Sequence, residues 1–259
     1  MLKPRLSQNF LSDPFVITRI VEAINPKPSD KILEIGPGKG ALTGSLLSRA
    51  GRLQAIDIDN DIVDFLRGQH WGEGLRLIRG NILDYDLSDL GKNVRVVGNL
   101  PYHISSPILL RVNHIVDNVM DGHFMLQKEL VDRVVANPGS RLYGRLSVTL
   151  GYYWDVVKLF DVSPLAFSPT PKVWSSVFRI VRKKNFSDRV FNFSFFSDLV
   201  RVAFSQRRKT LKKSLKNYLS PEDIGSLGLN SKDRAENLSV DDFIRLSDKA
   251  IENASSGNT

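Results

Sequence analysis

The tetrapeptide Asn99–Tyr102 carries the residue types in this chain that are best suited to chemistry. It follows an apolar run, Val94–Val97, that is typical of a buried strand. The order Asn-Leu-Pro-Tyr suits methylation of an exocyclic amine on a nucleobase, whose nitrogen is a weak nucleophile because its lone pair is delocalised into the ring. The Asn99 side-chain oxygen and a backbone carbonyl of the turn can accept the two N–H hydrogen bonds of such an amine, which frees the lone pair. Pro101 fixes φ in the turn, and Tyr102 offers a flat face on which the base can stack. Taken alone, the tetrapeptide also fits an ordinary turn at the end of a strand.

A glycine-rich segment, Glu34–Gly40, follows the first apolar run of the chain and precedes a helical pattern. Its glycines let the backbone turn sharply and approach a ligand closely. Asp57 ends the next apolar run, 21 positions after Gly36, where a carboxylate can accept hydrogen bonds from both ribose hydroxyls of an adenosine. Gly36, Gly38 and Ala41 also satisfy the dinucleotide fingerprint, so a nicotinamide dehydrogenase and a loop without a ligand remain alternatives at this point.

Three observations favour S-adenosylmethionine over a dinucleotide. The loop has the pattern E-x-G-x-G-x-G, which suits the methionine part of that cofactor better than a pyrophosphate. The turn at Asn99 follows the fourth predicted strand, so it lies at the carboxyl edge of the sheet, where open α/β sheets bind ligands. No Ser/Tyr–Lys or His–Asp arrangement suited to hydride transfer is evident.

Short apolar runs alternate with helical patterns through the first two-thirds of the chain, which predicts an α/β fold with a mostly parallel sheet. The predicted strands are Lys31–Ile35, Arg52–Asp57, Leu75–Arg79, Val94–Val97, His123–Leu126, Trp154–Phe160 and Val173–Val181. The predicted helices are Ala41–Ala50, Asp61–Gly68, Glu129–Val135, Phe195–Leu219, Pro221–Leu227 and Val240–Asn253. A polar stretch near residues 182–188 separates an expected catalytic α/β domain, residues 1–184, from an expected helical domain, residues 185–259.

The 259-residue chain has a net charge of +8, and the positive charge is concentrated between Arg179 and Lys216. This region holds 12 Lys and Arg residues against two acids, as expected for a surface that contacts a phosphate backbone. A solvated helix face is the alternative. The candidate RNA-binding residues are Arg207, Arg208, Lys209, Lys212, Lys213 and Lys216.

The composition excludes several classes of protein. There are no cysteines, so disulfides, thiol nucleophiles and zinc–cysteine sites are excluded. The four histidines lack the spacing of metal ligands, and we expect no metal. The N-terminus lacks the apolar segment of a signal peptide, and no apolar run approaches the ~18 residues of a membrane helix. We therefore expect a cytoplasmic, monomeric protein that has no membrane partner.

As a set, several motifs resemble those of the small-subunit ribosomal RNA adenine dimethyltransferases. The resemblance covers about residues 8–246 and rests on Gln8–Leu11, Glu34–Gly40, Gly98–Tyr102, Met125–Glu129, Tyr143–Val148, Phe167–Val173, Phe204–Leu211 and Arg234–Leu238. It implies a class I S-adenosylmethionine-dependent methyltransferase fold, which is Rossmann-like, with a small C-terminal helical domain. It also implies dimethylation of two adjacent adenines in a hairpin near the 3′ end of small-subunit rRNA, within a late assembly intermediate.

The resemblance also assigns roles to individual residues. Cofactor binding falls to Asn9, Leu11, Gly36, Gly38, Asp57, Asn81 and Asn99. Binding of the target base is assigned to Asn99, Leu100, Tyr102 and Phe167, of which Phe167 is the aromatic that stacks on the other face of the base. The chain departs from the family at Asn81, where Asp is usual, and at His103, where Asn is usual.

Two alternative functions share parts of this pattern. The large-subunit rRNA methyltransferases that confer macrolide resistance share the front motifs, but Gln206–Lys213 and Arg234–Leu238 argue against them. A non-catalytic assembly or transcription factor on the same fold would not need the complete loop, Asp57 and Asn99.

Overall fold

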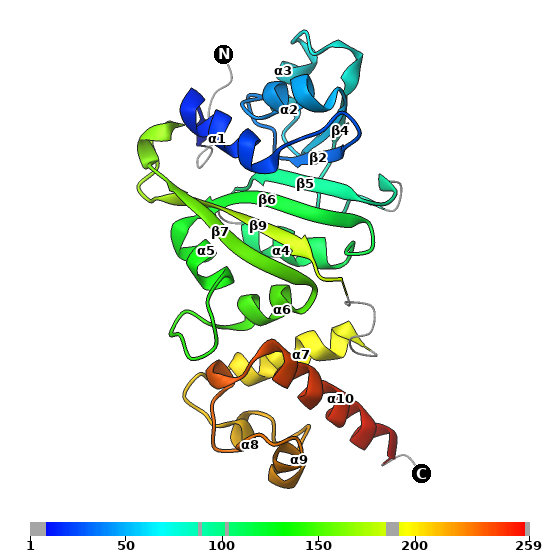
Figure 1. Ribbon diagram of the computed structural model, residues 1–259, viewed down its shortest axis with the longest axis vertical. Helices are drawn as coiled ribbons and strands as arrows, with labels where there is room; N and C mark the ends of the chain where they lie inside the picture. The colour runs from blue at the N-terminus through cyan, green and yellow to red at the C-terminus, as the bar shows by residue number, and fades with distance from the viewer. Residues whose placement is uncertain (1–8, 88–89, 102–103, 185–191, 257–259) are drawn as a thin grey trace. The chain divides into compact units, whose positions relative to one another are not determined.

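The computed structural model of the protein describes residues 9–87, 90–101, 104–184 and 192–256 (Figure 1). Tyr102 and His103, singled out by the sequence, lie outside the described residues. The strands are β1 (Phe10–Leu11), β2 (Lys31–Ile35), β3 (Leu53–Asp57), β4 (Leu75–Arg79), β5 (Val94–Asn99), β6 (Val119–Gln127), β7 (Trp154–Val162), β8 (Phe167–Ser168) and β9 (Ser175–Arg182). The α-helices are α1 (Pro14–Ile24), α2 (Thr43–Ala50), α3 (Asn60–Arg67), α4 (Ser105–Asn113), α5 (Lys128–Val134), α6 (Arg145–Tyr153), α7 (Phe193–Phe204), α8 (Leu211–Ser214), α9 (Pro221–Ser226) and α10 (Val240–Ser256). Short 3-10 helices include η1 (Gly72–Gly74), η4 (Pro164–Ala166) and η5 (Ala235–Asn237).

A seven-stranded sheet, in the order β4-β3-β2-β5-β6-β9-β7, forms the centre of the first part of the chain. Neighbours from β4 through β6 are parallel, and β9 runs antiparallel to β6. A separate two-stranded sheet pairs β1 with β8, with Leu11 opposite Phe167. Because the carboxyl ends of parallel strands meet at one edge, the residues that follow β2, β3, β4 and β5 are brought together there.

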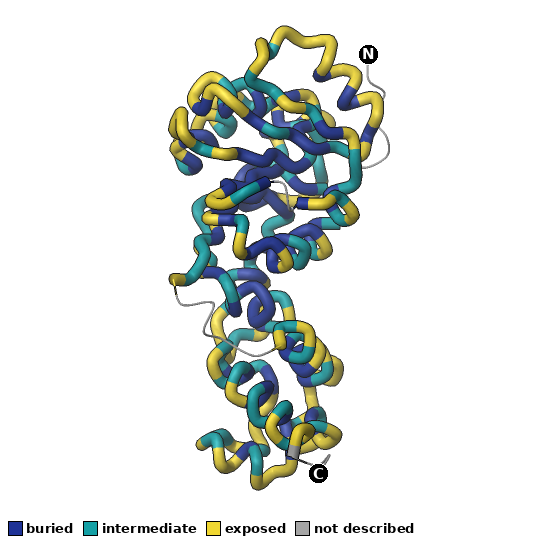
Figure 2. Tube along the Cα trace, turned by 90° about the vertical axis from the view of Figure 1, so that its right-hand side faces the viewer, coloured by how far each residue is buried: buried dark blue, intermediate teal, exposed yellow. Residues whose placement is uncertain are grey.

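The central strands and the first helix form for reasons that the sequence shows. β2 buries every residue after its first, and β5 buries every residue before its last, as strands covered on both faces do. α1 begins at Pro14, where the missing N–H costs nothing, and the Asp13 side chain accepts from the N–H groups of Phe15 and Val16. The helix ends at Asn25, whose φ is 50°. One apolar cluster joins α1 and α2 to β2 and β3, so these helices cover one face of the sheet (Figure 2).

A buried ion network ties the end of α1 to the amino ends of the strands. Arg95, in β5, donates from Nε and Nη2 to the Asp121 carboxylate in β6, at 2.9 Å for each contact. Its Nη1 donates to Asp30, just before β2, at 2.8 Å, and its Nη2 donates to the Ile24 carbonyl at 2.7 Å. Since Arg95 and Asp121 are both buried, this network satisfies charges that would otherwise be costly to keep inside the protein.

The chain folds as two compact units. The first comprises Met1–Val131 and Val156–Arg182, and the second comprises Asp132–Asp155 and Lys183–Thr259. The sequence analysis placed residues 132–155 in the α/β domain, whereas in the structure α6 packs with α7 and α10 around one apolar core. Tyr152 of α6 and Phe196 of α7 illustrate the packing, because their ring centroids are 4.6 Å apart. These aromatic contacts explain why α6 groups with the C-terminal helices.

Most predicted elements are found, with shifted ends. β2 and β4 match their predicted ranges, while β6 begins at Val119 rather than His123. The long helix predicted over Phe195–Leu219 is instead two helices, α7 and α8. The sequence analysis did not predict α1, α4 or α6. Among the residues described, no helix has the length and apolarity that a bilayer crossing requires.

Candidate active site

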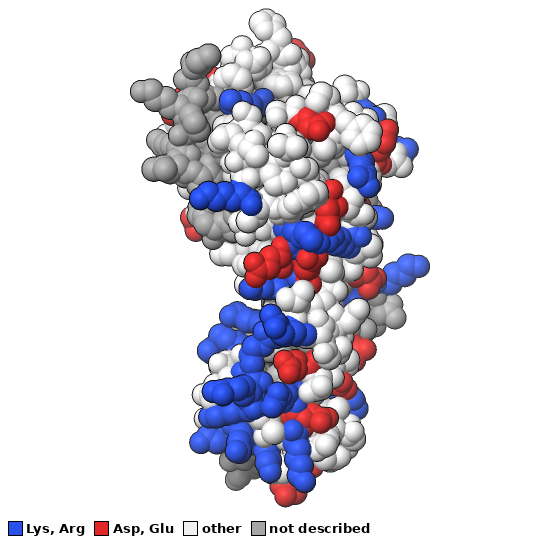
Figure 3. Space-filling model, turned by 90° about the vertical axis from the view of Figure 1, so that its left-hand side faces the viewer, with Lys and Arg blue, Asp and Glu red and all other residues white. Residues whose placement is uncertain are grey.

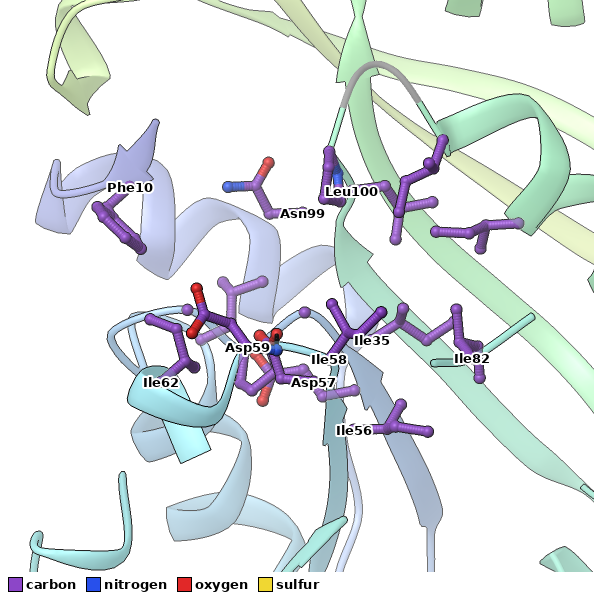
Figure 4. Close-up of a pocket in the computed structure, with 18 of the residues that line it drawn as sticks. Phe10, Ile35, Ile56, Asp57, Ile58, Asp59, Ile62, Ile82, Asn99 and Leu100 are labelled. Atoms are coloured by element: carbon purple, nitrogen blue, oxygen red, sulfur yellow. Dashed lines mark hydrogen bonds between the residues drawn. The ribbon is translucent and has the colours of Figure 1, made fainter. Parts of the chain in front are cut away.

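A cavity of about 450 Å³ lies at the carboxyl ends of β2, β3, β4 and β5 (Figure 4). Its wall is formed by β1, the glycine loop after β2, and the residues that end the other three strands. Among the sequence-predicted site residues, the structure brings together Asn9, Leu11, Gly36, Gly38, Asp57, Asn81, Asn99 and Leu100 in this wall. The predicted cofactor and target-base positions therefore meet in one cavity, which is within the ~300–1,000 Å³ range of small-molecule sites.

Two glycines of the loop, Gly38 and Gly40, lie too close to neighbouring aromatic rings to accept a side chain without displacing them. Gly38 has a φ of 55°, and a Cβ there would lie 3.2 Å from the Phe10 ring. Gly40 has a φ of 84°, and a Cβ there would lie 2.9 Å from the Trp71 ring. The Trp71 indole N–H donates to the Leu66 carbonyl at 2.8 Å, which holds the ring under the loop. The sequence analysis identified the loop but missed Trp71, because no local pattern links position 71 to it.

Glu34 is a carboxylate buried beneath the loop. It is 2% exposed, and its Oε2 accepts a 2.7 Å hydrogen bond from the Thr43 hydroxyl. Burial raises the pKa of Glu34 to about 7, although the Thr43 hydrogen bond opposes the shift. No described cation is paired with Glu34, so its charge is uncompensated in the fraction of molecules in which it is ionised, about half of them near pH 7.

Asp57 ends β3 and faces the cavity. Its Oδ1 accepts a 2.9 Å hydrogen bond from the Asp59 N–H. Burial raises the pKa of Asp57, while backbone N–H groups, among them those of Asp59 and Gly38, oppose the shift. Asp59 lies beside it and caps α3 by accepting from the Asp61 N–H at 3.0 Å. The Asp57 carboxylate lies in the cavity wall, where it can accept a hydrogen bond from a ligand (Figure 4).

Asn99 is the last residue of β5, and hydrogen bonds anchor the described residues that follow it. The Leu100 N–H donates to the Met125 carbonyl at 3.1 Å, and the Ser105 hydroxyl donates to the Pro101 carbonyl at 2.8 Å. A Cβ on Gly98 would lie 2.8 Å from the Ile35 carbonyl oxygen, so glycine is required for β5 to pack here. In Figure 4 the Asn99 amide lies between Phe10 and Leu100.

The two-residue strand β1 forms one side of the cavity, and β8 pairs with it from behind the wall. Phe10, which the sequence analysis did not single out, lines the cavity and contacts Lys39, whose Nζ lies 4.7 Å from its ring centroid. Leu11 also lines the cavity. Phe167 is 3% exposed, packs in the same apolar cluster as Leu11 and is not part of the cavity wall. Its predicted stacking on a target base stays a prediction.

Asn81, the departure from the family pattern, lies at the cavity wall with its amide already engaged. Its Oδ1 accepts from the Leu83 N–H at 3.1 Å, and its Nδ2 donates to an Asp84 carboxylate oxygen at 2.7 Å. The backbone carbonyl of Asn81 accepts from Asp84 and Tyr85. The side chain therefore organises the loop after β4.

The basic run of the second unit is exposed. The six predicted RNA-binding residues all have exposed side chains, and Lys and Arg gather on one face of this unit (Figure 3). Arg207 differs from the others because its Nη2 donates to the carbonyls of Arg141 and Tyr143, at 2.8 Å each. Arg207 thus also holds the segment before α6. Among the described residues, no group of three or more His, Asp or Glu side chains is placed to hold a metal ion.

Comparison with known proteins gives consistent results. A family model described as ribosomal RNA adenine dimethylase matches residues 1–252. A protein of Xylella fastidiosa named ribosomal RNA small subunit methyltransferase A is 47% identical over 249 residues, 94% of each chain. Proteins of the same name from Nitrosospira multiformis and Neisseria meningitidis are 45% identical over 242 residues, 93% of each chain, and 42% identical over 245 residues, 95% of each chain.

Solved structures show the same fold. A dimethyladenosine transferase from Plasmodium falciparum aligns with a TM-score of 0.80 at 26% identity, covering 96% of this chain and 98% of that one. The 23S rRNA methyltransferase ErmE aligns with a TM-score of 0.72 at 22% identity, covering 94% and 100% of the two chains, and supports the fold alone. The predicted fold class, a class I methyltransferase domain with a helical C-terminal part, is confirmed.

Proposed function

Because the chain belongs to the ribosomal RNA adenine dimethylase family, we propose that it methylates the N6 amines of two adjacent adenines in a hairpin near the 3′ end of small-subunit rRNA. The family membership predicted from the sequence is confirmed by the family match and by relatives that are more than 40% identical. The observation that carries the proposal is the meeting of the glycine loop, Asp57 and Asn99 in one cavity.

The cavity residues fit S-adenosylmethionine. The loop glycines leave room for the methionine part, and Asp57 supplies an acceptor for ribose hydroxyls. Glu34, a buried carboxylate without a described cationic partner, is complementary to a cationic ligand. The bound cofactor supplies an electrophilic methyl group, so the protein mainly positions and polarises the reacting amine.

Asn99 and Leu100 are placed to receive the target amine. The Asn99 side-chain oxygen and the Leu100 carbonyl accept its N–H hydrogen bonds, which makes the lone pair available for in-line attack on the methyl group. No strong base is needed, because the amine becomes acidic only after it has gained the methyl group. After the first transfer one N–H remains, and either acceptor can hold it for the second.

The wider setting of the reaction follows from the family and from the charge distribution. We propose that the exposed basic run of the second unit contacts rRNA phosphates, as Lys and Arg do when they position a nucleic acid. The substrate is rRNA within an immature small subunit. The enzyme acts as a cytoplasmic monomer.

The decisive experiment combines activity with mapping of the modified nucleotides. Undermethylated small subunits and, separately, large subunits are incubated with the protein and a labelled methyl donor. Label on two adjacent adenines of small-subunit rRNA is expected. Label on the large subunit, or no label at all, would overturn the proposal in favour of the large-subunit enzyme or the non-catalytic factor.

A variant then tests the site. Asn99→Ala removes the side-chain acceptor and should lower the rate of methyl transfer by about 10²–10³-fold, the usual effect of losing one polarising hydrogen bond. Small-subunit binding should persist. Asn137→Ala, an exposed position in the second unit, serves as the control. Near-normal turnover of Asn99→Ala would assign the polarisation of the amine to another group.

A further inference from the structure

A second concave surface lies at the opposite, amino end of the same strands in the first unit. This amino-end groove has a volume of about 190 Å³, below the ~300–1,000 Å³ of a typical small-molecule pocket. It is lined by the beginnings of β2, β3, β4 and β5. It shares no residue with the cofactor cavity.

The groove lies where the amino ends of β3 and β4 are uncovered on one face of the sheet, beside the buried Leu33 of β2. Leu33, Gln54 and Arg76 are register partners on neighbouring strands, so their side chains point to the same face. That face is the one opposite the cluster formed by α1 and α2, which contains Ile32 and Leu53. The described part of the connection between β4 and β5 forms turns, not an α-helix, and leaves the amino ends of β3 and β4 uncovered. A parallel sheet normally has helices on both faces.

The lining combines an apolar floor with a cationic rim. Leu33, Leu90 and Val94 are buried at the floor, while the three cations, Lys31, Arg52 and Arg76, are exposed. Among the residues that the structure describes, no carboxylate lines the groove. The neighbouring Asp30 is turned away, because its carboxylate accepts from Arg95 at 2.8 Å.

The turns that border the groove are held by close backbone packing and by a side-chain hydrogen bond. A Cβ on Gly74 would lie 2.3 Å from the Gly51 carbonyl oxygen, so these two turns are pressed together. The Asn118 side chain donates to the Gly91 carbonyl at 2.7 Å, and a Cβ on Gly91 would lie 3.2 Å from the Lys31 ammonium nitrogen. The groove is therefore preformed.

We propose that the amino-end groove binds the sugar-phosphate backbone of rRNA, as a second contact distinct from the basic run of the second unit. Three cations, with no acid among the described residues that line the groove, suit phosphates, and the apolar floor suits the face of a ribose or base. Contacts to phosphate and sugar carry no sequence information, so we expect the groove to bind RNA irrespective of its sequence. This inference rests on the proposed function only in taking rRNA as the partner.

The test compares two triple variants of the full chain. Lys31→Gln/Arg52→Gln/Arg76→Gln removes the rim charge. The control, Lys27→Gln/Arg49→Gln/Arg67→Gln, removes three exposed charges of the first unit that line neither cavity. Binding to protein-free small-subunit rRNA is measured over a range of salt concentrations, together with affinity for S-adenosylmethionine.

The rim variant should lower the slope of log K against log salt by about 2–3 units, because each phosphate contact contributes about 0.7–0.9. With undermethylated subunits its KM should rise while kcat is unchanged. A slope equal to that of the parent, or an equal fall in the control, would overturn the inference. An effect seen on whole subunits but not on protein-free rRNA would assign the groove to an acidic ribosomal protein and would also overturn it.

The experiments distinguish failure of the proposed methyltransferase function from failure of the proposed RNA contact in the groove. If the parent chain transfers no methyl group to small subunits, the function fails, while the salt slope on rRNA still decides the groove. If the rim variant loses S-adenosylmethionine binding and so is misfolded, Gln54→Glu replaces it by placing one negative charge on the floor. That single change should weaken rRNA binding several-fold, with Gln54→Ala close to the parent, and equal binding by both would exclude the groove.

Discussion

The carboxylates at the two ends of the parallel strands differ in whether a cation is paired with them. At the carboxyl end, Glu34 and Asp57 lie at the cavity wall without a described cationic partner, and burial raises the pKa of both. At the amino end, Asp121 and Asp30 are bonded to Arg95 at 2.8–2.9 Å. At the carboxyl end the carboxylate charge remains for a ligand to neutralise, whereas at the amino end Arg95 already neutralises it.

This contrast separates carboxylates that destabilise the empty protein from carboxylates whose charge is neutralised within the fold. An uncompensated buried carboxylate costs free energy in the empty protein, and a cationic ligand can recover that cost on binding. A paired buried charge still carries a desolvation cost, but the pairing offsets much of it, and removing the partner is strongly destabilising. Substitutions at the amino end should therefore act on folding, and those at the carboxyl end on ligand binding and on pH dependence.

Removing the amino-end cation should have the largest effect. Arg95→Ala removes both short bonds to the buried Asp121 carboxylate and leaves it with the longer, 3.4 Å contact to Arg179, so we expect a loss of up to about 3–5 kcal/mol in the free energy of unfolding. Urea denaturation measures it. The exposed pair of Arg79 and Asp64, at 2.7 Å, provides the control, because Arg79→Ala should cost less than about 1 kcal/mol. Equal losses of unfolding free energy in Arg95→Ala and Arg79→Ala would show that the buried network matters no more to folding than the exposed pair.

The second prediction concerns pH. The folded-state pKa of Glu34 is about 7, above its unfolded value of 4.5, so its contribution to stability is complete below pH 4.5 and is lost as pH rises through 7. The free energy of unfolding of the parent should thus fall by up to about 3 kcal/mol across this window relative to Glu34→Gln. Denaturation at pH 4.5 and pH 8 measures the difference. Exposed Glu73→Gln should follow the parent, and parallel pH profiles for Glu34→Gln and the parent would show that Glu34 is not destabilised by burial.

A smaller effect is expected at the ribose position. Asp57→Ala should weaken S-adenosylmethionine binding by about 1.5–3 kcal/mol, the scale of hydrogen bonds to a charged acceptor. Because the pKa of Asp57 is raised, affinity in the parent should also increase as pH rises and the carboxylate ionises. Calorimetry at two pH values checks both statements. Unchanged affinity in the variant would place the ribose elsewhere.

The smallest effect belongs to Asn81. Asn81→Asp replaces the donor to Asp84 with a second carboxylate, so we expect cofactor affinity to fall by about 1 kcal/mol. Adding Asp84→Asn should restore it, because the new amide can donate to the introduced carboxylate. Calorimetry on the two single variants and the double variant measures the coupling. Additive effects would show that the Asn81–Asp84 bond does not organise the site.

Local patterns predicted most of the strands and the glycine loop after β2, because both are encoded within a few residues. The apolar runs Lys31–Ile35 and Leu75–Arg79 became β2 and β4 without a shift in their ends. α1 was missed although Asp13 and Pro14 form a helix start and the apolar spacing after them is helical. That signal was present and could have been used.

Other features depend on contacts that no local pattern contains. Helical periodicity over Phe195–Leu219 did not show that α7 ends at Phe204. The next helix, α8, begins at Leu211, whose N–H donates to the carbonyl of the distant Asp233 at 2.8 Å. The partners of Arg95 lie on other strands. Phe10 lines the cavity because β1 pairs with β8, and two-residue strands leave no periodic signal.

The pairing of β1 with β8 also sets an order of events during protein synthesis. Ser12 donates to the Ala166 carbonyl from both its N–H and its hydroxyl, across 154 positions of sequence. At roughly 5–20 residues per second, the ribosome needs about 8–30 seconds to make that stretch. Until then the N-terminal segment has no partner strand, so the cavity of a growing chain stays open along the side that Phe10 and Leu11 later close. The nascent protein thus completes the wall of this cavity only after most of the first unit has been translated.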